Sequence, residues 1–304
     1  MPDLYNLARD AAVVVPAADR DTLVVTGPDR SSWLEGLVTC ELKALAPGAG
    51  TWGLVLNRQG KIQSAVWVVA GDDRLWLSFA PGTGAAMEAE LGRMLIMEDA
   101  ELAAPEAPHT WFSLHGPDAA THAASWAATA GGASAAIDFT GLGGAALVVP
   151  AEREAVVRSS GDGLFLDAEA WTTLRLERGL PEFGVDYDGL DRPHEAALDR
   201  KAISWTKGCY LGQEVVCMQD MRGKVRRSLR VLLIDAPAGA STLAGGRLVS
   251  IASGKDAGGV TSAAYSQRAG AWLAMAKLQL DAIDAGLRYE GASGTHPARL
   301  AEPV

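Results

Sequence analysis

Short runs of alternating apolar and polar residues fill the N-terminal third of the chain. They lie at 23–26, 51–56, 62–69 and 75–79. Side chains on a β-strand point alternately to its two faces, so this pattern predicts strands with one buried face. The turn sequences Gly27-Pro28 and Gly71-Asp-Asp73 end two of them. Apolar residues three and four positions apart predict helices over 32–38 and 83–96. The N-terminal third is therefore expected to mix strands and helices.

Two prolines, Pro105 and Pro108, mark a boundary, and a smaller module with its own strands and helices is expected after it. Its predicted elements are strands at 110–114 and 145–149 and helices at 118–130 and 152–158. One more helix is predicted over 168–178, where the chain leaves this module.

The remainder of the chain, from residue 228 onward, is rich in predicted strands that glycine- and alanine-rich turns separate. These strands are expected at 229–234, 247–251, 259–265 and 272–278. Several short strands of this kind suit a small β-barrel or sandwich. The whole chain is thus predicted to be α+β, in three parts.

The composition is that of an ordinary globular protein. Of the 304 residues, 48% are apolar and 21% are charged, which argues against extensive disorder and leaves room for two or three domains. The net charge of −10 argues against a general nucleic-acid binder. No apolar run approaches the roughly 18 residues that span a bilayer, and the run at 11–15 is too short for a signal peptide. A soluble, cytoplasmic protein is expected.

Three cysteines, Cys40, Cys209 and Cys217, are too few for a disulfide framework and point to a reducing compartment. Cys40 and Cys217 have apolar neighbours and are expected in the core. No cysteine or histidine pair has metal-ligand spacing, so no metal site is predicted. Glycine-rich segments at 82–87 and 141–144 fit turns better than a nucleotide-binding loop.

The densest set of reactive groups is the octapeptide Lys207-Gly-Cys-Tyr-Leu-Gly-Gln-Glu214. It combines an ammonium, a thiol, a phenol, an amide and a carboxylate with two glycines that allow unusual backbone angles. From Lys201 to Arg230 the net charge is +5 on a chain of net charge −10. A basic stretch on an acidic protein attracts anions.

Two residues are candidates for specific chemistry. Lys207 lies two positions from Cys209, and an adjacent cation favours the reactive thiolate; the alternative is a small residue that fills a loop. Glu177, at a predicted helix end, could accept two parallel N–H bonds from a flat aminopyrimidine. Its alternative role is a solvated ion pair with Arg175 or Arg178.

The stretch from 174 to 232 resembles the YgfZ-type folate-binding proteins, relatives of the glycine-cleavage T protein (aminomethyltransferase). The resemblance rests on Leu174-Arg-Leu-Glu-Arg-Gly-Leu-Pro181, on Pro193 and Glu195, on the octapeptide, and on Arg222-Gly223 before Arg226-Arg227. The N-terminal third follows the same family plan, with Gly27-Pro-Asp29, Trp33-Leu34, Pro47-Gly48 and Leu56-Asn57.

The resemblance implies a three-domain, aminomethyltransferase-like ring of class α+β. Residues 1–107 and 165–227 would form the folate-binding domain, 108–164 a small α+β domain, and 228–304 a C-terminal β-barrel.

The resemblance also implies a function: a tetrahydrofolate-binding accessory protein in the maturation or repair of iron–sulfur enzymes, including tRNA-modifying ones. Cys209 matches the functional thiol of the family, and Glu177 matches the glutamate that holds the pteridine in aminomethyltransferases. The other expected contacts to tetrahydrofolate or a derivative are Lys207, Tyr210, Gln213, Glu214 and Arg222. The expected partners are folate and iron–sulfur enzymes, with neither a membrane nor a nucleic acid as a direct ligand.

Two departures from the family pattern keep alternatives open. Gln63, Ser64 and Ala65 stand where aminomethyltransferases carry a catalytic aspartate, so proton transfer in that reaction lacks its main group. Cys217, Met218 and Gln219 occupy the span in which the signature usually has an arginine. The alternatives are a true folate-dependent aminomethyltransferase or one-carbon transferase, and a folate-free scaffold whose loop contacts a protein or tRNA.

Overall fold

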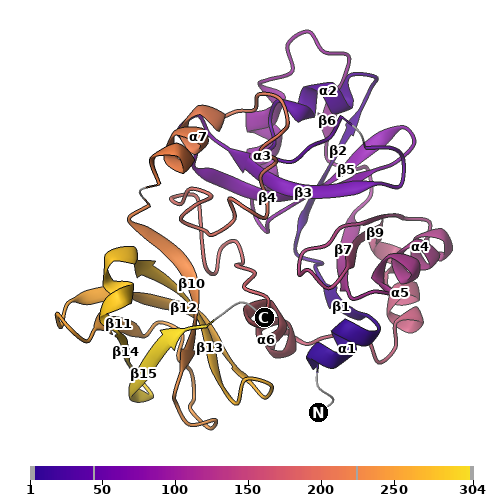
Figure 1. Cartoon of the computed structure of the whole chain (residues 1–304). Coiled ribbons are helices and arrows are strands. Elements are labelled where there is room, and N and C mark those ends of the chain that lie inside the picture. The colour runs from indigo at the N-terminus through magenta and orange to yellow at the C-terminus, as the bar shows by residue number, and fades with distance from the viewer. Residues whose placement is uncertain (1–3, 44, 224, 302–304) are drawn as a thin grey trace. The chain divides into compact units, whose positions relative to one another are not determined.

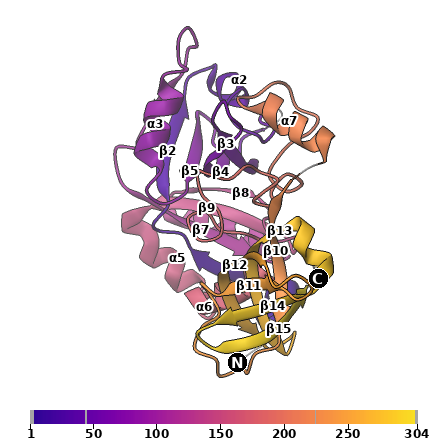
Figure 2. The same ribbon diagram turned by 90° about the vertical axis from the view of Figure 1, so that its left-hand side faces the viewer.

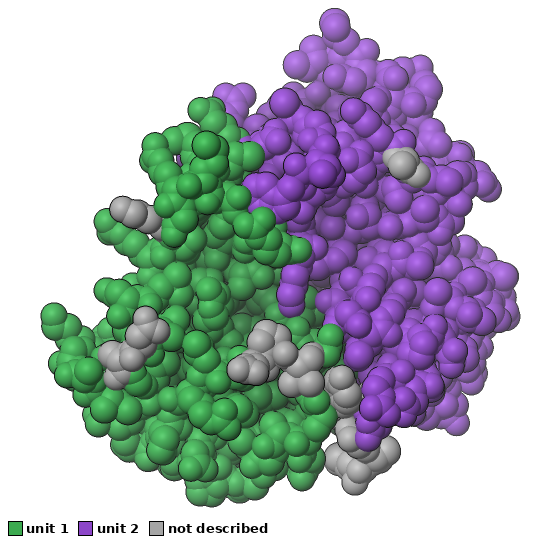
Figure 3. Space-filling model, in the orientation of Figure 1, with its two compact units in different colours: residues 1–4, 167–200, 214–304 green, residues 5–166, 201–213 purple. Residues whose placement is uncertain are grey.

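The computed structural model describes residues 4–43, 45–223 and 225–301. The chain divides into two compact units (Figure 3). We call them the two-sheet unit, residues 5–166 and 201–213, and the barrel unit, formed mainly by 167–200 and 214–304. Each unit is therefore assembled from separate stretches of the chain. The predicted three-domain boundaries stay a prediction, because two compact units neither confirm nor exclude a further subdivision.

The first sheet of the two-sheet unit is antiparallel, in the order β3-β4-β5-β2-β6 (Figure 1). Its strands are β2 (Asp21–Thr26), β3 (Gly50–Leu56), β4 (Ile62–Ala70), β5 (Arg74–Phe79) and β6 (Glu101–Ala103). The helices α2 (Arg30–Glu35) and α3 (Gly84–Gly92) pack their apolar side chains against its core, which includes Leu34, Leu77 and Met87. This burial of alternate strand residues and of one helix stripe is what the polarity pattern predicts.

The second sheet is also antiparallel, in the order β1-β7-β9-β8. Its strands are β1 (Val13–Pro16), β7 (His109–His115), β8 (Ala133–Ala136) and β9 (Gly144–Pro150). Helices α4 (Ala119–Ala130) and α5 (Glu154–Ser160) lie on one side of it (Figure 1), with Trp126 of α4 packed in the same core as Phe112 and Leu147. The short helix α1 (Leu4–Asp10) and the 3₁₀ turn η1 (Ala151–Arg153) complete this part.

His115, at the end of β7, is fully buried, and its Nε2 lies 3.1 Å from the Ser113 hydroxyl. Burial lowers the pKa of His115 from 6.5 to about 4, because the charged ring would lose its hydration. The unfolded chain therefore binds a proton below pH 6.5 that the folded chain does not bind until about pH 4.

This difference predicts a pH-dependent stability. As the pH falls from 6.5 towards 4, His115 should lower the free energy of unfolding by about 1.4 kcal/mol per pH unit. The variant His115→Gln keeps a hydrogen-bonding group and cannot titrate, so its urea-unfolding free energy should fall less steeply over this range. Parallel pH dependence of variant and wild type would contradict the assignment.

The barrel unit contains a closed antiparallel barrel in the order β10-β13-β12-β11-β14-β15, seen from a second side in Figure 2. Its strands are β10 (Arg227–Ile234), β11 (Arg247–Ser250), β12 (Asp256–Ser266), β13 (Ala271–Gln279), β14 (Leu287–Gly291) and β15 (Gly294–Leu300). The other elements are α6 (Ala168–Glu177), α7 (Gln213–Arg222) and the 3₁₀ turn η2 (Leu280–Ala285). Closure leaves no unpaired sheet edge, which protects the strands from pairing with other chains.

A buried ionic cluster ties α6 to the barrel. Arg175 of α6 donates to the Asp186 carboxylate at 2.6 Å, and both side chains are almost fully buried. The hydroxyls of Thr261 and Ser262 on β12 donate to the other oxygen of Asp186, at 2.5 and 2.6 Å. Because every buried charge here has partners, the cost of desolvating it is offset.

The predicted class is confirmed: the chain is α+β, with a closed six-stranded barrel at its C-terminal end. The polarity pattern missed the helices α1 and α7 and the strands β1, β6, β8, β14 and β15. The helix predicted over 83–96 ends at Gly92. Among the described residues, no helix combines the length and the apolar character needed to cross a membrane.

Candidate functional site

The octapeptide is anchored in the two-sheet unit by Lys207. The ammonium of Lys207 donates hydrogen bonds to three backbone carbonyls, those of Glu35 (2.8 Å), Val38 (2.8 Å) and Cys40 (2.6 Å). Its Nζ also lies 3.3 Å from the Glu35 carboxylate, and the lysine side chain is fully buried. An ammonium has three hydrogens, and all three have acceptors in the protein. Lys207 therefore has a structural role, and its expected contact with the cofactor stays a prediction.

Glu35 is the buried counter-charge that sequence reasoning missed. It ends α2, is only 4% exposed, and its second oxygen accepts the Leu42 N–H at 2.6 Å. The sequence does contain an indication of this pair. A carboxylate that lies inside the apolar stripe beginning with Trp33 and Leu34 requires a buried partner. Nothing in the sequence shows that this partner comes from the octapeptide.

The thiol of Cys209 lies on the exposed part of this loop, and Gly208 beside it is also exposed. A Cβ built on Gly208 would lie 3.8 Å from the Nζ of Lys43, so the cation near this part of the loop is Lys43. The loop is thus fixed at Lys207 and open at Cys209. This arrangement can present a nucleophile or a metal-binding sulfur to a partner molecule.

The second glycine of the octapeptide, Gly212, is required by the backbone. Its φ is +82°, and a Cβ there would lie 2.6 Å from the Asn57 carbonyl oxygen. The neighbouring Leu211 N–H donates to the Gly36 carbonyl at 3.0 Å. The loop therefore rests directly on the turn between β3 and β4 and on the end of α2, and any larger residue at Gly212 would push it away.

The other predicted contacts of the loop divide into two groups. Tyr210 is buried, with its ring centroid 5.7 Å from the Lys207 ammonium, and its N–H donates to the Gln213 side-chain oxygen at 3.4 Å. Glu214 and Arg222, both on α7, are exposed. Tyr210 and Gln213 thus help to shape the loop, and roles for these four residues in ligand binding stay predictions.

The remaining cysteines have different surroundings. Cys40 is 4% exposed, and burial raises the pKa of its thiol to about 12, so it stays protonated at neutral pH. Cys217 lies half-buried in α7. Cys209 is the exposed one of the three free thiols.

Glu177 ends α6 in the barrel unit, where it is 7% exposed. Its Oε1 accepts a hydrogen bond from the Ser266 hydroxyl at 2.5 Å, and its Oε2 lies 3.7 Å from Nε of Arg268. The alternative of a solvated ion pair with Arg175 is wrong, since Arg175 pairs with Asp186 and Glu182. The carboxylate is held in place yet keeps acceptor capacity, because two oxygens offer about four lone-pair positions.

No carboxylate occupies the position of the catalytic aspartate on β4. Ser64 is fully buried there, accepts the Ala80 N–H at 3.0 Å and bonds the Thr83 hydroxyl at 2.9 Å. Gln63 donates to the Lys61 carbonyl at 3.4 Å. Both side chains have local structural partners.

One cluster of possible metal ligands occurs among the described residues, in the barrel unit. Ligand atoms of His194, Asp199 and Asp220 all lie within 4.8 Å of one another. Arg200 donates to Asp220 at 2.6 Å and lies 3.3 Å from Asp199. The guanidinium thus already neutralises both carboxylates.

Comparisons with known proteins agree with this picture. No family model matches the chain. The tRNA-modifying protein YgfZ of Yersinia pseudotuberculosis is 25% identical over 222 residues, which cover 68% of this chain. The match spans 66% of that relative, just under two thirds of the relative's length. The mitochondrial iron–sulfur cluster assembly factor IBA57 of Mus musculus is 33% identical over 95 residues, 30% of this chain and 26% of the relative.

A solved structure shows the same fold. The glycine cleavage system aminomethyltransferase T from Bartonella henselae superposes with a TM-score of 0.77 over 98% of this chain and 87% of that protein, at 20% identity. At this identity the likeness establishes the fold alone. The chain is thus similar in sequence to YgfZ-type proteins and has the aminomethyltransferase fold.

Proposed function

We propose that this chain is a tetrahydrofolate-binding accessory protein in the maturation or repair of iron–sulfur enzymes, tRNA-modifying enzymes among them. The observation that carries the proposal is the exposed Cys209 thiol on a loop that the buried Lys207 fixes in place. The names of the relatives, a tRNA-modifying protein and an iron–sulfur cluster assembly factor, support the same role.

Cys209 supplies the reactive group in this proposal. A thiolate binds iron and accepts sulfur, and both reactions need access from solvent. An accessible cysteine on a flexible loop would also react, but without a defined geometry. The anchored loop holds the sulfur in one position against a client protein.

Glu177 supplies the folate contact. The N–H groups of an aminopyrimidine ring require an acceptor that is already oriented, and the bond from Ser266 orients this carboxylate. Bound folate would supply one-carbon or redox chemistry, and the Glu177 carboxylate would hold its ring. The carboxylate fits this task because its remaining lone pairs are free to accept.

The second candidate is a true aminomethyltransferase or one-carbon transferase, which the fold likeness favours. Its reaction requires a group that moves a proton at the folate nitrogen. Ser64, in the corresponding place, is fully buried and bonded to Ala80 and Thr83, and Gln63 is not an acid or a base. We therefore expect no release of methylene-tetrahydrofolate from an aminomethyl donor. The third candidate, a folate-free scaffold, predicts partner binding that weakens strongly with salt.

A tetrahydrofolate titration under anaerobic conditions tests the proposal. The nine tryptophans make quenching of intrinsic fluorescence a practical signal, checked by calorimetry. We expect a Kd near micromolar, about −8 kcal/mol. Glu177→Gln removes the charge and keeps the shape, and it should weaken binding at least about tenfold, about 1.4 kcal/mol.

Glu169→Gln is the matched control, since Glu169 is an exposed carboxylate in the first turn of the same helix. Its affinity for tetrahydrofolate should equal that of the wild type. An absence of binding up to millimolar tetrahydrofolate refutes both folate candidates and leaves the scaffold. Equal affinities of wild type and Glu177→Gln would remove Glu177 from the site.

A further inference from the structure

A cavity of about 1270 Å³ lies within the barrel unit, and Arg222 is the one expected folate contact that lines it. One face of α7 lines it, because Val215, Met218, Gln219 and Arg222 recur at the spacing of helical turns. The segment before β10 and the junction of β13 with η2 contribute the rest of the wall. The cavity is large enough for a small organic ligand.

Positive charge dominates its wall. Arg192, Arg222 and Arg226 supply three guanidinium groups, against the single carboxylate of Asp281. Arg222 and Arg226 are exposed, and within the described part of the chain neither has a carboxylate at ion-pair distance. The whole chain is acidic, so an excess of cations at one cavity is a local feature that favours an anionic ligand.

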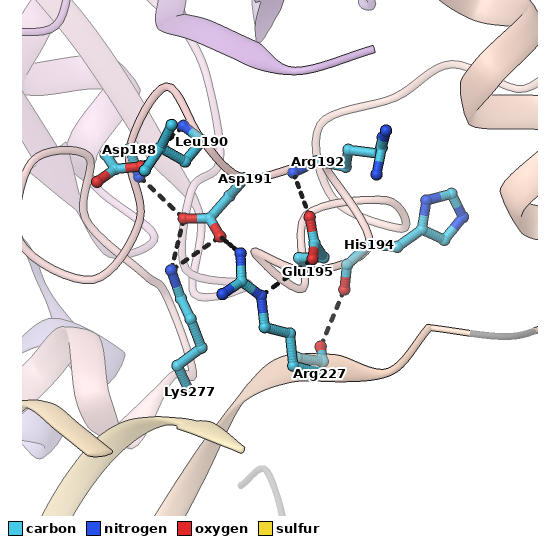
Figure 4. Close-up of polar contacts among 9 residues, drawn as sticks. Asp188, Leu190, Asp191, Arg192, His194, Glu195, Arg227 and Lys277 are labelled. Carbon is cyan, nitrogen blue, oxygen red and sulfur yellow. Dashed lines mark hydrogen bonds and ion pairs between the residues drawn. The ribbon is translucent and has the colours of Figure 1, made fainter. Parts of the chain in front are cut away.

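The segment that carries Arg192 is held by a partly buried polar network (Figure 4). The neighbouring Asp191 is fully buried and accepts two hydrogen bonds from the Lys277 ammonium, at 2.8 and 2.6 Å. Glu195 accepts from the Arg192 N–H at 3.0 Å and from Arg227 Nε at 3.1 Å. The network fixes the backbone of this segment, and Figure 4 shows the Arg192 side chain extending away from the Asp191–Lys277 pair.

The remainder of the wall is suited to a flat, partly polar ring. Val215, Met218 and Leu280 offer apolar surface. The side-chain oxygen of Gln219 is buried and has no hydrogen-bond partner within the described residues. A buried acceptor without a donor is costly, and a ligand N–H would satisfy it.

We propose that this cavity binds a nucleoside phosphate. The guanidinium groups of Arg222 and Arg226, with Arg192, would bind the phosphate. A planar guanidinium can donate two parallel hydrogen bonds to two phosphate oxygens. The base would lie against Met218 and Leu280 and donate an amino N–H to Gln219. This inference does not rest on the folate proposal, and it assigns Arg222 to a different ligand from the one expected from the sequence. The ligand is either a free nucleotide or the terminal nucleotide of an RNA.

Calorimetry with the full chain tests the site, with AMP, ADP, adenosine and inorganic phosphate as probes. AMP and ADP should bind at least about tenfold more tightly than adenosine or phosphate, and more weakly at high salt. The double variant Arg222→Ala/Arg226→Ala should lose at least about tenfold in AMP affinity, about 1.4 kcal/mol. Arg299→Ala, an exposed arginine on β15 of the same unit, should bind as the wild type does.

If thermal unfolding shows that the double variant does not fold, the single variant Arg226→Gln replaces it in the titration. Its loss of AMP affinity should be smaller. A hexaribonucleotide with a 5′-phosphate separates the two sources: tighter binding than AMP indicates an RNA end, and equal or weaker binding indicates a free nucleotide. The proposal is overturned by no AMP binding at millimolar concentration, by phosphate binding as tightly as AMP, or by an equal loss in Arg299→Ala. It is also overturned if the double variant loses tetrahydrofolate affinity in parallel, which would assign the cavity to the folate.

Discussion

Replacing Lys207 with methionine is expected to lower the free energy of unfolding by about 3–5 kcal/mol. The methionine side chain fills similar volume, so the loss is electrostatic. It leaves the Glu35 carboxylate buried without a counter-charge and removes the donor from three carbonyls, those of Glu35, Val38 and Cys40. Urea unfolding followed by tryptophan fluorescence measures the change, and the octapeptide loop should become sensitive to proteolysis at lower urea concentration.

Lys43→Met is the matched control, because Lys43 is an exposed lysine of the same unit and its removal should change stability by less than about 0.5 kcal/mol. The double variant Glu35→Gln/Lys207→Met should recover part of the loss, since it removes the uncompensated charge as well. A loss below about 1 kcal/mol in Lys207→Met alone would show that the buried pair does not anchor the loop.

Cys209→Ser is expected to abolish the cellular function while leaving the fold intact. The hydroxyl is nearly isosteric with the thiol but binds iron and accepts sulfur poorly, and the residue is exposed, so stability should change by less than about 0.5 kcal/mol. The measurement is the amount of a tRNA modification made by an iron–sulfur enzyme, in a strain that lacks the gene and carries the variant. We expect the level of the empty strain.

Cys217→Ser provides the comparison, because Cys217 is half-buried in α7 and its loss should leave the modification near the wild-type level. Full restoration by Cys209→Ser would refute a role for this thiol. Partial restoration by both variants would instead indicate that either sulfur can serve the client.

Local pattern was enough to predict most elements of the fold. Strands such as β4 and β13 bury alternate or continuous apolar residues over nine positions, and the flanking turns define their ends. The prediction missed short elements for a physical reason. β1, at Val13–Pro16, has four residues. It forms a strand because it pairs with β7, about a hundred positions away in the sequence, where Val14 pairs with Leu114.

The candidate site shows the same division between local and distant information. The octapeptide and Glu177 stand out in the sequence because of their residue types. The partners that define their roles are distant: Lys207 meets the Glu35 carbonyl across 172 positions, and Glu177 meets Ser266 across 89. The sequence places Lys207 two positions from the Cys209 thiol and so allows it to activate that thiol, but the Lys207 side chain turns inward to the carbonyls at and after the end of α2.

The two-sheet unit takes its last piece, residues 201–213, after the chain has already supplied 167–200 to the barrel unit. On the ribosome, the nascent chain therefore exposes Glu35 and its carbonyls long before Lys207 is made. Until then the Glu35 carboxylate lacks its buried counter-charge, which disfavours the closed form of this part of the unit. The octapeptide thus completes the two-sheet unit late in synthesis. A fragment that ends at residue 166 would lack this stabilising segment.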